Sequence, residues 1–145
     1  MFVDHIGYLT HDINKAILLF TQMGFVQETE IIVDDQAGCG SDGERFAPRN
    51  VYLCFLTNGD YRVELVSPVD EHSIVSKILK KQGDGPYHIC YQVSDIYEKI
   101  EQLKASGWLV IQKPASAIAF KGGGTVAFLY KKNIGMIELV AVRKE

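Results

Sequence analysis

The sequence predicts an α+β fold built from two tandem βαβββ modules. Three observations predict it: a repeat at the start of each half, a second repeat at the end of each half, and one order of strand-like and helix-like segments in both. A chain of 145 residues has the usual length of one domain. We expect a single domain, 1–145, with module one at about 1–68, a linker helix at about 69–84 and module two at about 85–145.

The first repeat appears when the chain is shifted by 83 positions, which places Asp4–Phe25 on Tyr87–Trp108. Seven of the 22 paired residues are identical, where average composition gives roughly one or two. Each segment carries a histidine at its second position, His5 and His88. This similarity indicates a duplication.

The second repeat appears at a shift of 74 positions and places Val51–Val66 on Thr125–Val140 without a gap. Both segments end in Glu-Leu-Val, with the carboxylates of Glu64 and Glu138 in register. The shift becomes smaller because the first half has a longer loop, 34–50, rich in glycine. Each half therefore opens with a histidine-bearing strand and closes with a glutamate-bearing strand.

In the first half, Asp12 is a good helix N-cap and Gly24 a good residue to follow the helix. Apolar residues recur at helical spacing between them. The expected strands are Val3–Leu9, Phe25–Val33, Val51–Leu56 and Tyr61–Val66.

In the second half, a helix is expected at Asp95–Ser106, with Gly107 ending it. A short helix at about Ser73–Gln82 connects the halves. The expected strands are Tyr87–Val93, Trp108–Gln112, Thr125–Tyr130 and Met136–Val142.

The composition excludes several classes of protein. Hydrophobic residues make up 47% of the chain and charged residues 23%, as in ordinary globular proteins. The net charge of −3 gives no reason to expect nucleic acid or an anionic membrane as a partner. We expect no membrane span, no signal peptide and a cytoplasmic location. Of the three cysteines, Cys54 and Cys90 are expected to be buried.

His5, Glu64, His88 and Glu138 each interrupt a strand whose other face is apolar. A carboxylate in the middle of a sheet is costly unless it is paired or binds a metal. Two imidazoles and two carboxylates suit one divalent ion of Zn, Ni, Co, Mn or Fe. We therefore predict that the curved mixed sheets form a cup that holds one such ion.

Several segments also resemble a known family, the vicinal oxygen chelate superfamily, which includes glyoxalase I, methylmalonyl-CoA epimerase, extradiol dioxygenases and bleomycin-resistance proteins. Asp4-His5-Ile6-Gly7-Tyr8 resembles the opening strand of the family. The segments most similar to the epimerases are Val63–Pro68, Ser73–Leu79, Gly85–Ile89, Val126–Leu129 and Ile137–Leu139. The predicted metal ligands of this chain differ from those of the epimerases at one position. Epimerases commonly have Gln at the position of Glu64, whereas glyoxalase I has Glu there.

The resemblance implies a metal-dependent epimerase or isomerase that shifts a proton α to the carbonyl of an acyl thioester through a metal-stabilised enolate. It implies Glu138 as the base, with Glu64 acting on the other side of the carbon. Tyr52, Phe128 and Lys121 are expected to contact the small-molecule substrate. Relatives are commonly homodimers, so a homodimer is expected here.

Three alternatives to the epimerase function stay open from the sequence. The first is a lyase of the lactoylglutathione lyase (glyoxalase I) type, acting on a thiol-derived hemithioacetal. The second is a metal-free protein that sequesters a drug, which the four intact ligand positions disfavour. The third is a ring-cleaving dioxygenase, and such relatives usually lack a carboxylate at the position of Glu64. The sequence does not decide between an epimerase and a lyase.

Overall fold

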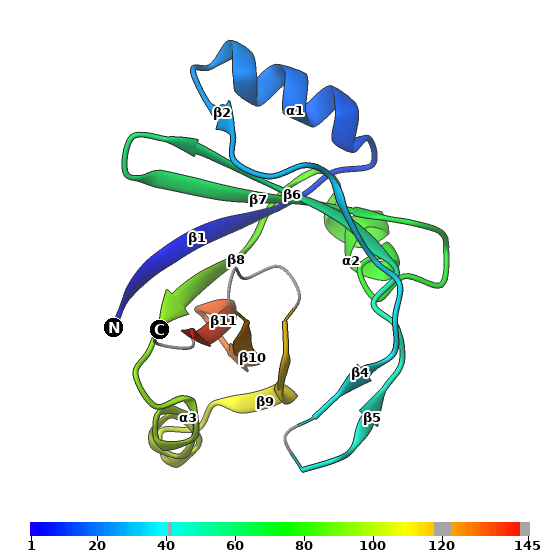
Figure 1. Cartoon of the computed structure of the whole chain (residues 1–145). Coiled ribbons are helices and arrows are strands. Elements are labelled where there is room, and N and C mark those ends of the chain that lie inside the picture. The colour runs from blue at the N-terminus through cyan, green and yellow to red at the C-terminus, as the bar shows by residue number, and fades with distance from the viewer. Residues whose placement is uncertain (41, 118–122, 143–145) are drawn as a thin grey trace. The chain divides into compact units, whose positions relative to one another are not determined.

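The computed structural model describes residues 1–40, 42–117 and 123–142, and its fold is the predicted α+β class (Figure 1). The chain divides into two compact units. The N-terminal unit contains His5–Ala37 and Ala47–Tyr87, and the C-terminal unit contains Met1–Asp4, Gly38–Phe46 and His88–Glu145. The grouping of the whole chain into one domain stays a prediction.

The N-terminal unit is a mixed sheet with a helix packed on one face. Its strands are β1 (Phe2–Leu9, which enters this unit at His5), β7 (Tyr61–Pro68), β6 (Val51–Asn58), β2 (Val26–Gln27) and β3 (Ile32–Asp34). β1 and β7 are parallel, and the other pairs are antiparallel. Helix α1 (Ile13–Gln22) lies along β6 and β7 (Figure 1), where it covers an apolar cluster that includes Ile13, Cys54 and Leu65.

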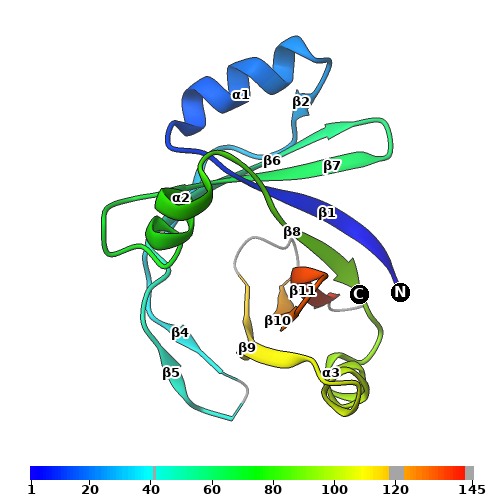
Figure 2. The same ribbon diagram turned by 180° about the vertical axis from the view of Figure 1, so that it is seen from behind.

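The ends of α1 are determined locally, as the sequence predicts. The Asp12 carboxylate accepts a hydrogen bond from the Lys15 backbone N–H at 3.1 Å, so it satisfies a free donor of the first turn. After the helix, Gly24 adopts φ 100°, a conformation that favours glycine. The helix that connects the two halves of the sequence is α2 (Ser76–Gln82). It lies near the C-terminal end of β7, away from the β6–β7 turn (Figure 2).

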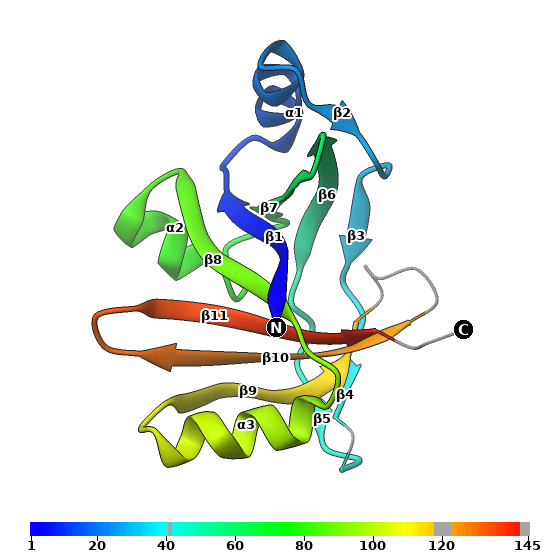
Figure 3. The same ribbon diagram turned by 90° about the vertical axis from the view of Figure 1, so that its left-hand side faces the viewer.

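The C-terminal unit repeats this arrangement. Its main strands, in hydrogen-bonded order, are β8 (Gly85–Gln92, which enters this unit at His88), β11 (Gly135–Val142), β10 (Gly124–Lys131) and β9 (Leu109–Ser116). Helix α3 (Ile96–Ala105) runs along β9 (Figure 3). The Asp95 carboxylate caps its N-terminus, and the Lys131 ammonium donates to the Ser106 carbonyl at its C-terminus at 3.0 Å.

The strand expected at Phe25–Val33 is wrong as a single element, because it is interrupted between β2 and β3. The pairing with β6 changes from Gln27 opposite Leu56 to Ile32 opposite Leu53, so two extra residues lie between these pairs. At the interruption, the Glu28 and Thr29 N–H groups both donate to one carbonyl, that of Phe55. This long-range bulge leaves no periodic signal in the sequence.

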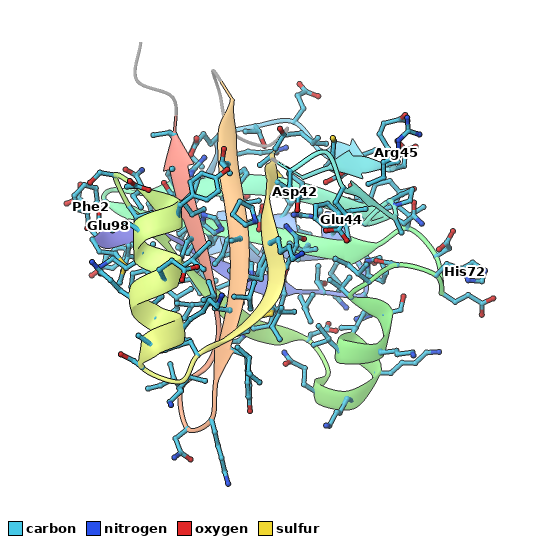
Figure 4. The ribbon with its side chains drawn as sticks, turned by 90° about the horizontal axis from the view of Figure 1, so that it is seen from below. Phe2, Asp42, Glu44, Arg45, His72 and Glu98 are labelled. Carbon is cyan, nitrogen blue, oxygen red and sulfur yellow. The ribbon has the colours of Figure 1, made fainter. Side chains whose placement is uncertain are left out.

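The segment 34–50, expected to be a loop, contains a short hairpin of β4 (Gly38–Cys39) and β5 (Arg45–Phe46). The hairpin belongs to the C-terminal unit, where Gly40 forms a bridge with Ala115 and the Glu44 carboxylate lies 3.4 Å from the Lys113 ammonium. The charged side chains labelled at this hairpin in Figure 4 are Asp42, Glu44 and Arg45. The hairpin therefore contacts a strand of the other half of the sequence.

Cys54 and Cys90 have no exposed surface, which confirms the prediction that they are buried, and Cys39 is exposed. Within the described residues, none of the helices has the length and apolar character needed to cross a membrane.

Candidate active site

In the N-terminal unit, His5 and Glu64 form a buried pair on adjacent parallel strands. Gly7 lies opposite Glu64 in the β1–β7 register, and His5 is two residues before Gly7, so both side chains lie on one face of the sheet. The His5 Nε2 atom is 3.6 Å from a Glu64 carboxylate oxygen. The residues are only 1% and 8% exposed, respectively, so water is nearly excluded from the pair.

In the C-terminal unit, His88 and Glu138 form the equivalent pair. Cys90 lies opposite Glu138 in the β8–β11 register, and His88 is two residues before Cys90. The His88 Nε2 atom is 3.1 Å from a Glu138 carboxylate oxygen, and both residues are 4% exposed. The two units therefore hold their His–Glu pairs in the same backbone register, as expected of a duplication.

A phenylalanine ring packs edge-on against each histidine. Phe55 lies opposite Glu64 on β6 and contacts His5, with ring centroids 5.2 Å apart. Phe128 lies opposite Glu138 on β10 and contacts His88, with centroids 5.6 Å apart. These contacts limit the rotation of both imidazoles.

The positions of Phe55 and Phe128 show that the gapless alignment of the second sequence repeat is wrong before the hairpin turn. A gapless shift of 74 positions pairs Cys54 with Phe128, but the cross-strand registers make Phe55 the equivalent of Phe128. The hairpin that follows Phe128 closes at Lys131 and Gly135, whereas the earlier one closes at Asn58 and Tyr61, so the second hairpin has one more residue in its turn. The repeat therefore contains a one-residue gap in the hairpin turn.

A charged pair supports Phe55 in the N-terminal unit. The Arg62 guanidinium lies 4.0 Å from the Phe55 ring centroid and donates two hydrogen bonds to the Glu28 carboxylate, at 2.9 and 3.0 Å. The Arg62 side chain is 20% exposed, so this bidentate pair holds it over the ring. At the repeat-equivalent position the C-terminal unit has Met136, so this support is not duplicated.

Each His–Glu pair has donor atoms and spacing that fit a metal ion. Two ligand atoms at about 2.1 Å from one cation lie about 3.0 Å apart at a right angle and about 3.4 Å apart at the tetrahedral angle. The observed separations are 3.1 Å for His88–Glu138 and 3.6 Å for His5–Glu64. Imidazole nitrogen with carboxylate oxygen suits a divalent transition metal.

The residues predicted to contact a substrate differ in their placement. Phe128 lies beside His88, on the face that carries the His–Glu pair. Tyr52 packs with Cys54 and Leu56 in the cluster beneath α1, on the face of the sheet opposite to Phe55 and Glu64, so we do not include it in the site. Lys121 lies outside the described residues.

The two remaining histidines of the chain are exposed. The His11 side chain is 71% exposed, although its ring lies 2.7 Å from the Asp84 carboxylate. His72 projects from the segment before α2 (Figure 4), with its side chain 78% exposed.

Sequence reasoning missed Asp34, which ends β3. Asp34 lies opposite Val51 on β6, and Val51 shares its face with Phe55, so Asp34 is on the same side of the sheet as Glu64. Burial raises the pKa of Asp34 above its ordinary value of 3.8, the Arg49 charge lowers it, and the Asp35 and Glu64 charges raise it. Its position after a strand-like segment was the only available signal.

We expect Asp34→Asn to stabilise the fold at neutral pH. A carboxyl group with a raised pKa in the folded state contributes stability only while it is protonated, and that contribution is lost as pH rises through the raised pKa. The Asn variant and the wild type should differ little in free energy of unfolding near the ordinary pKa of 3.8, and the variant should become more stable as pH rises. Urea unfolding at several pH values would measure this, and a difference independent of pH would contradict it.

The sequence profile of the Glyoxalase/Bleomycin resistance protein/Dioxygenase superfamily matches residues 4–128. The chain belongs to this superfamily. In the N-terminal unit the match includes the strands that carry His5 and Glu64, β1 and β7. In the C-terminal unit it runs from β8 through most of β10. This membership confirms the family resemblance of the sequence.

Among curated members of the superfamily, the chain is similar to two enzymes named as epimerases. It is 33% identical to the ethylmalonyl-CoA/methylmalonyl-CoA epimerase of Cereibacter sphaeroides over 95 residues, which are 63% of this chain and 70% of that protein. It is 24% identical to the mitochondrial methylmalonyl-CoA epimerase of Mus musculus over 140 residues, which are 94% of this chain and 71% of that protein.

Solved structures of the superfamily show the same fold. Methylmalonyl-CoA epimerase from Mycobacterium tuberculosis matches with a TM-score of 0.76 and 21% identity, over 98% of this chain and 88% of that one. A variant of the Streptomyces coelicolor methylmalonyl-CoA epimerase in complex with 2-nitronate-propionyl-CoA matches with a TM-score of 0.75 and 22% identity, over 99% of both chains.

Proposed function

We propose that the protein is a divalent-metal-dependent epimerase that moves the proton on the carbon α to the carbonyl of an acyl-CoA thioester. Methylmalonyl-CoA is the first candidate substrate, because both curated relatives carry that substrate in their names. The observation that carries the proposal is the recurrence of a buried His–Glu pair, in one register, in both units.

The proposal assigns both pairs to one cation, with His5, Glu64, His88 and Glu138 as its four protein ligands. The donor types and the separations within each pair support this assignment. A divalent ion in such a site supplies Lewis acidity to the thioester carbonyl, which makes the α-hydrogen more acidic. Zn, Ni, Co, Mn and Fe all suit the ligand set.

Glu138 is the proposed base. One of its oxygens lies near the His88 imidazole, and the residue is almost completely buried, so few waters compete for its lone pairs. In the proposed step, a Glu138 oxygen takes the α-proton, and the electron pair of the broken C–H bond delocalises onto the thioester carbonyl. The ring of Phe128, packed on His88, holds the neighbouring imidazole in place.

Inversion of the α-carbon requires that a proton return from the side opposite to Glu138. The symmetry of the repeat makes the N-terminal unit the source of this second proton-transfer group, and Glu64 is the counterpart that the sequence suggests. The homodimer and the cytoplasmic location predicted from the sequence remain proposals.

The second candidate is a lyase of the glyoxalase I type, which a specific residue favours. The carboxylate of Glu64 stands where the sequence resemblance associates Glu with glyoxalase I and Gln with epimerases. Both activities shift a proton next to a carbonyl, so the same residues would serve either substrate.

Exchange of the α-hydrogen with solvent deuterium distinguishes these activities. The metal-loaded protein should exchange the α-hydrogen of methylmalonyl-CoA in D2O and interconvert its two epimers, as followed by NMR. Turnover of the methylglyoxal–glutathione adduct, with no exchange of methylmalonyl-CoA, would instead identify the lyase. Failure with both substrates would contradict the proposed function.

A further inference from the structure

We propose that Arg62, held by Glu28, is a positioning residue for His5 in the N-terminal unit. The inference rests on the proposed function only in taking His5 as a metal ligand. In this role Arg62 does not bind the metal; it acts through the ring of Phe55, which packs against the His5 imidazole. Three observations support it: the face on which Arg62 lies, the contacts that join Glu28 to His5, and a second hold on the Phe55 backbone.

The strand registers place Arg62 on the face that carries the His–Glu pair. Gly7 on β1 lies opposite Glu64 on the parallel strand β7. His5 and Arg62 each come two residues earlier on these strands, so their side chains lie on the same face as that of Glu64. Phe55 lies opposite Glu64 on β6, the next strand of the sheet (Figure 1). Arg62 is therefore a neighbour of the pair.

A continuous series of contacts runs from Glu28 to His5. The Arg62 guanidinium donates two hydrogen bonds to the Glu28 carboxylate, at 2.9 and 3.0 Å. Its central carbon lies 4.0 Å from the centroid of the Phe55 ring, and that ring meets the His5 imidazole edge-on, with centroids 5.2 Å apart. A bidentate pair fixes the plane of the guanidinium as well as its position, so one side of the Phe55 ring is covered by an oriented group.

The same segment also holds the backbone of Phe55. The N–H groups of Glu28 and Thr29 donate to the Phe55 carbonyl at 2.8 and 3.3 Å, and the Phe55 N–H donates to the Thr29 hydroxyl at 3.1 Å. Glu28 thus contacts Phe55 through its backbone and, through Arg62, covers its ring. Phe55 has no exposed surface, so these contacts fix the ring beside His5.

The charges of the pair suit a position beside a metal site. A guanidinium without a counter-charge on this face would repel a divalent ion. The Glu28 carboxylate offsets that charge and at the same time orients the Arg62 group. Residues that orient a ligand from behind it commonly strengthen metal binding without touching the metal. The pair therefore keeps the imidazole in place with little electrostatic penalty for the ion.

The test compares wild type and Arg62→Met in their affinity for Zn²⁺ and in the visible absorption spectrum of the Co²⁺-loaded protein. Methionine is the residue of the C-terminal unit at the repeat-equivalent position, Met136, and it can lie over an aromatic ring without a charge. We expect the Zn²⁺ affinity of Arg62→Met to fall by about 10- to 100-fold. The Co²⁺ bands should also change, because they report the geometry of the ligands.

The direction of the change separates positioning from a purely electrostatic role. Loss of a positive charge would by itself strengthen the binding of a cation, whereas loss of the positioning group weakens it. Arg62→Lys keeps the charge but not the bidentate pair, so it should recover only part of the affinity. The matched control is Arg45→Met, which changes an exposed arginine of the β4–β5 hairpin (Figure 4) and should bind Zn²⁺ as wild type does.

Glu28→Gln tests the same route without changing Arg62. It should weaken Zn²⁺ binding several-fold, and its effect should be much smaller when Arg62 is already methionine, because Glu28 acts through Arg62. Glu30→Gln, which removes an exposed carboxylate of the same segment, is the control. This comparison also decides the matter if Arg62→Met does not fold: equal affinities of Glu28→Gln and Glu30→Gln would overturn the inference.

The inference is also overturned if Arg62→Met binds Zn²⁺ as tightly as wild type or more tightly, or if its Co²⁺ spectrum is that of wild type. Equal effects of Glu28→Gln with and without Arg62 would overturn it too. These readouts do not depend on turnover. A wild type that binds Zn²⁺ and shows these effects but exchanges no α-hydrogen would contradict the proposed reaction and leave the positioning role supported, whereas a wild type that binds no divalent ion would overturn both.

Discussion

Glu138→Gln is expected to lower the rate of α-hydrogen exchange by about 10²- to 10⁴-fold, the range for removal of a general base. Glutamine keeps an oxygen that can ligate a cation but cannot accept the α-proton. The metal content of the variant should therefore fall less than its activity. The measurement is exchange in D2O, alongside metal analysis of the same preparation.

Glu101→Gln is the matched control for this variant, because it changes a glutamate of the same unit whose side chain is 74% exposed. It should exchange the α-hydrogen at the wild-type rate. The double variant Glu64→Gln with Glu138→Gln extends the test to both carboxylates of the proposed ligand set. If it turned over substrate at the wild-type rate with metal still bound, neither glutamate could be the base.

His88→Ala is expected to lose the metal and, with it, most of the activity. In the proposed site a ligand is removed, and the buried Glu138 carboxylate loses the imidazole that lies 3.1 Å away. Metal analysis should fall from about one ion per chain to a small fraction of that value. The exposed His72, replaced by alanine, serves as the control and should keep its metal.

The thermal stability of the protein tests metal binding by His88 independently of the metal analysis. A ligand present at about 100 times its dissociation constant stabilises the folded state by roughly 2.7 kcal/mol, which corresponds to a Tm shift of about 5–10 °C for a chain of this size. The wild type should lose this increment when treated with a chelator, and His88→Ala should show no chelator effect. A chelator effect of equal size in both proteins would mean that the ion binds elsewhere.

The sequence predicted the elements that local chemistry determines. Asp12 and Asp95 cap helices because their carboxylates satisfy free N–H groups of the first turn. The four candidate ligands, His5, Glu64, His88 and Glu138, followed from strand alternation and from the repeat, whereas the strand registers show which histidine lies beside which glutamate in each unit. The convergence of both pairs on one ion remains a prediction.

The sequence did not predict features that depend on contacts between distant segments. The interruption between β2 and β3 arises where Glu28 and Thr29 share the Phe55 carbonyl, an interaction across more than 20 residues that leaves no local pattern. The hairpin at β4 and β5 was expected to be a loop, because its pairing is short and its contact to Ala115 is long-range.

The amino-acid sequence by itself determined the duplication, the family resemblance and the four candidate ligands, because repeated motifs and period-two alternation are visible in one dimension. Only the tertiary structure decided that Tyr52 packs beneath α1 and that Asp34 shares a face with Glu64. The physical reason is that pairing between strands determines which side chains share a face, and the registers of β3 and β7 with β6 depend on contacts between segments that are distant in the sequence.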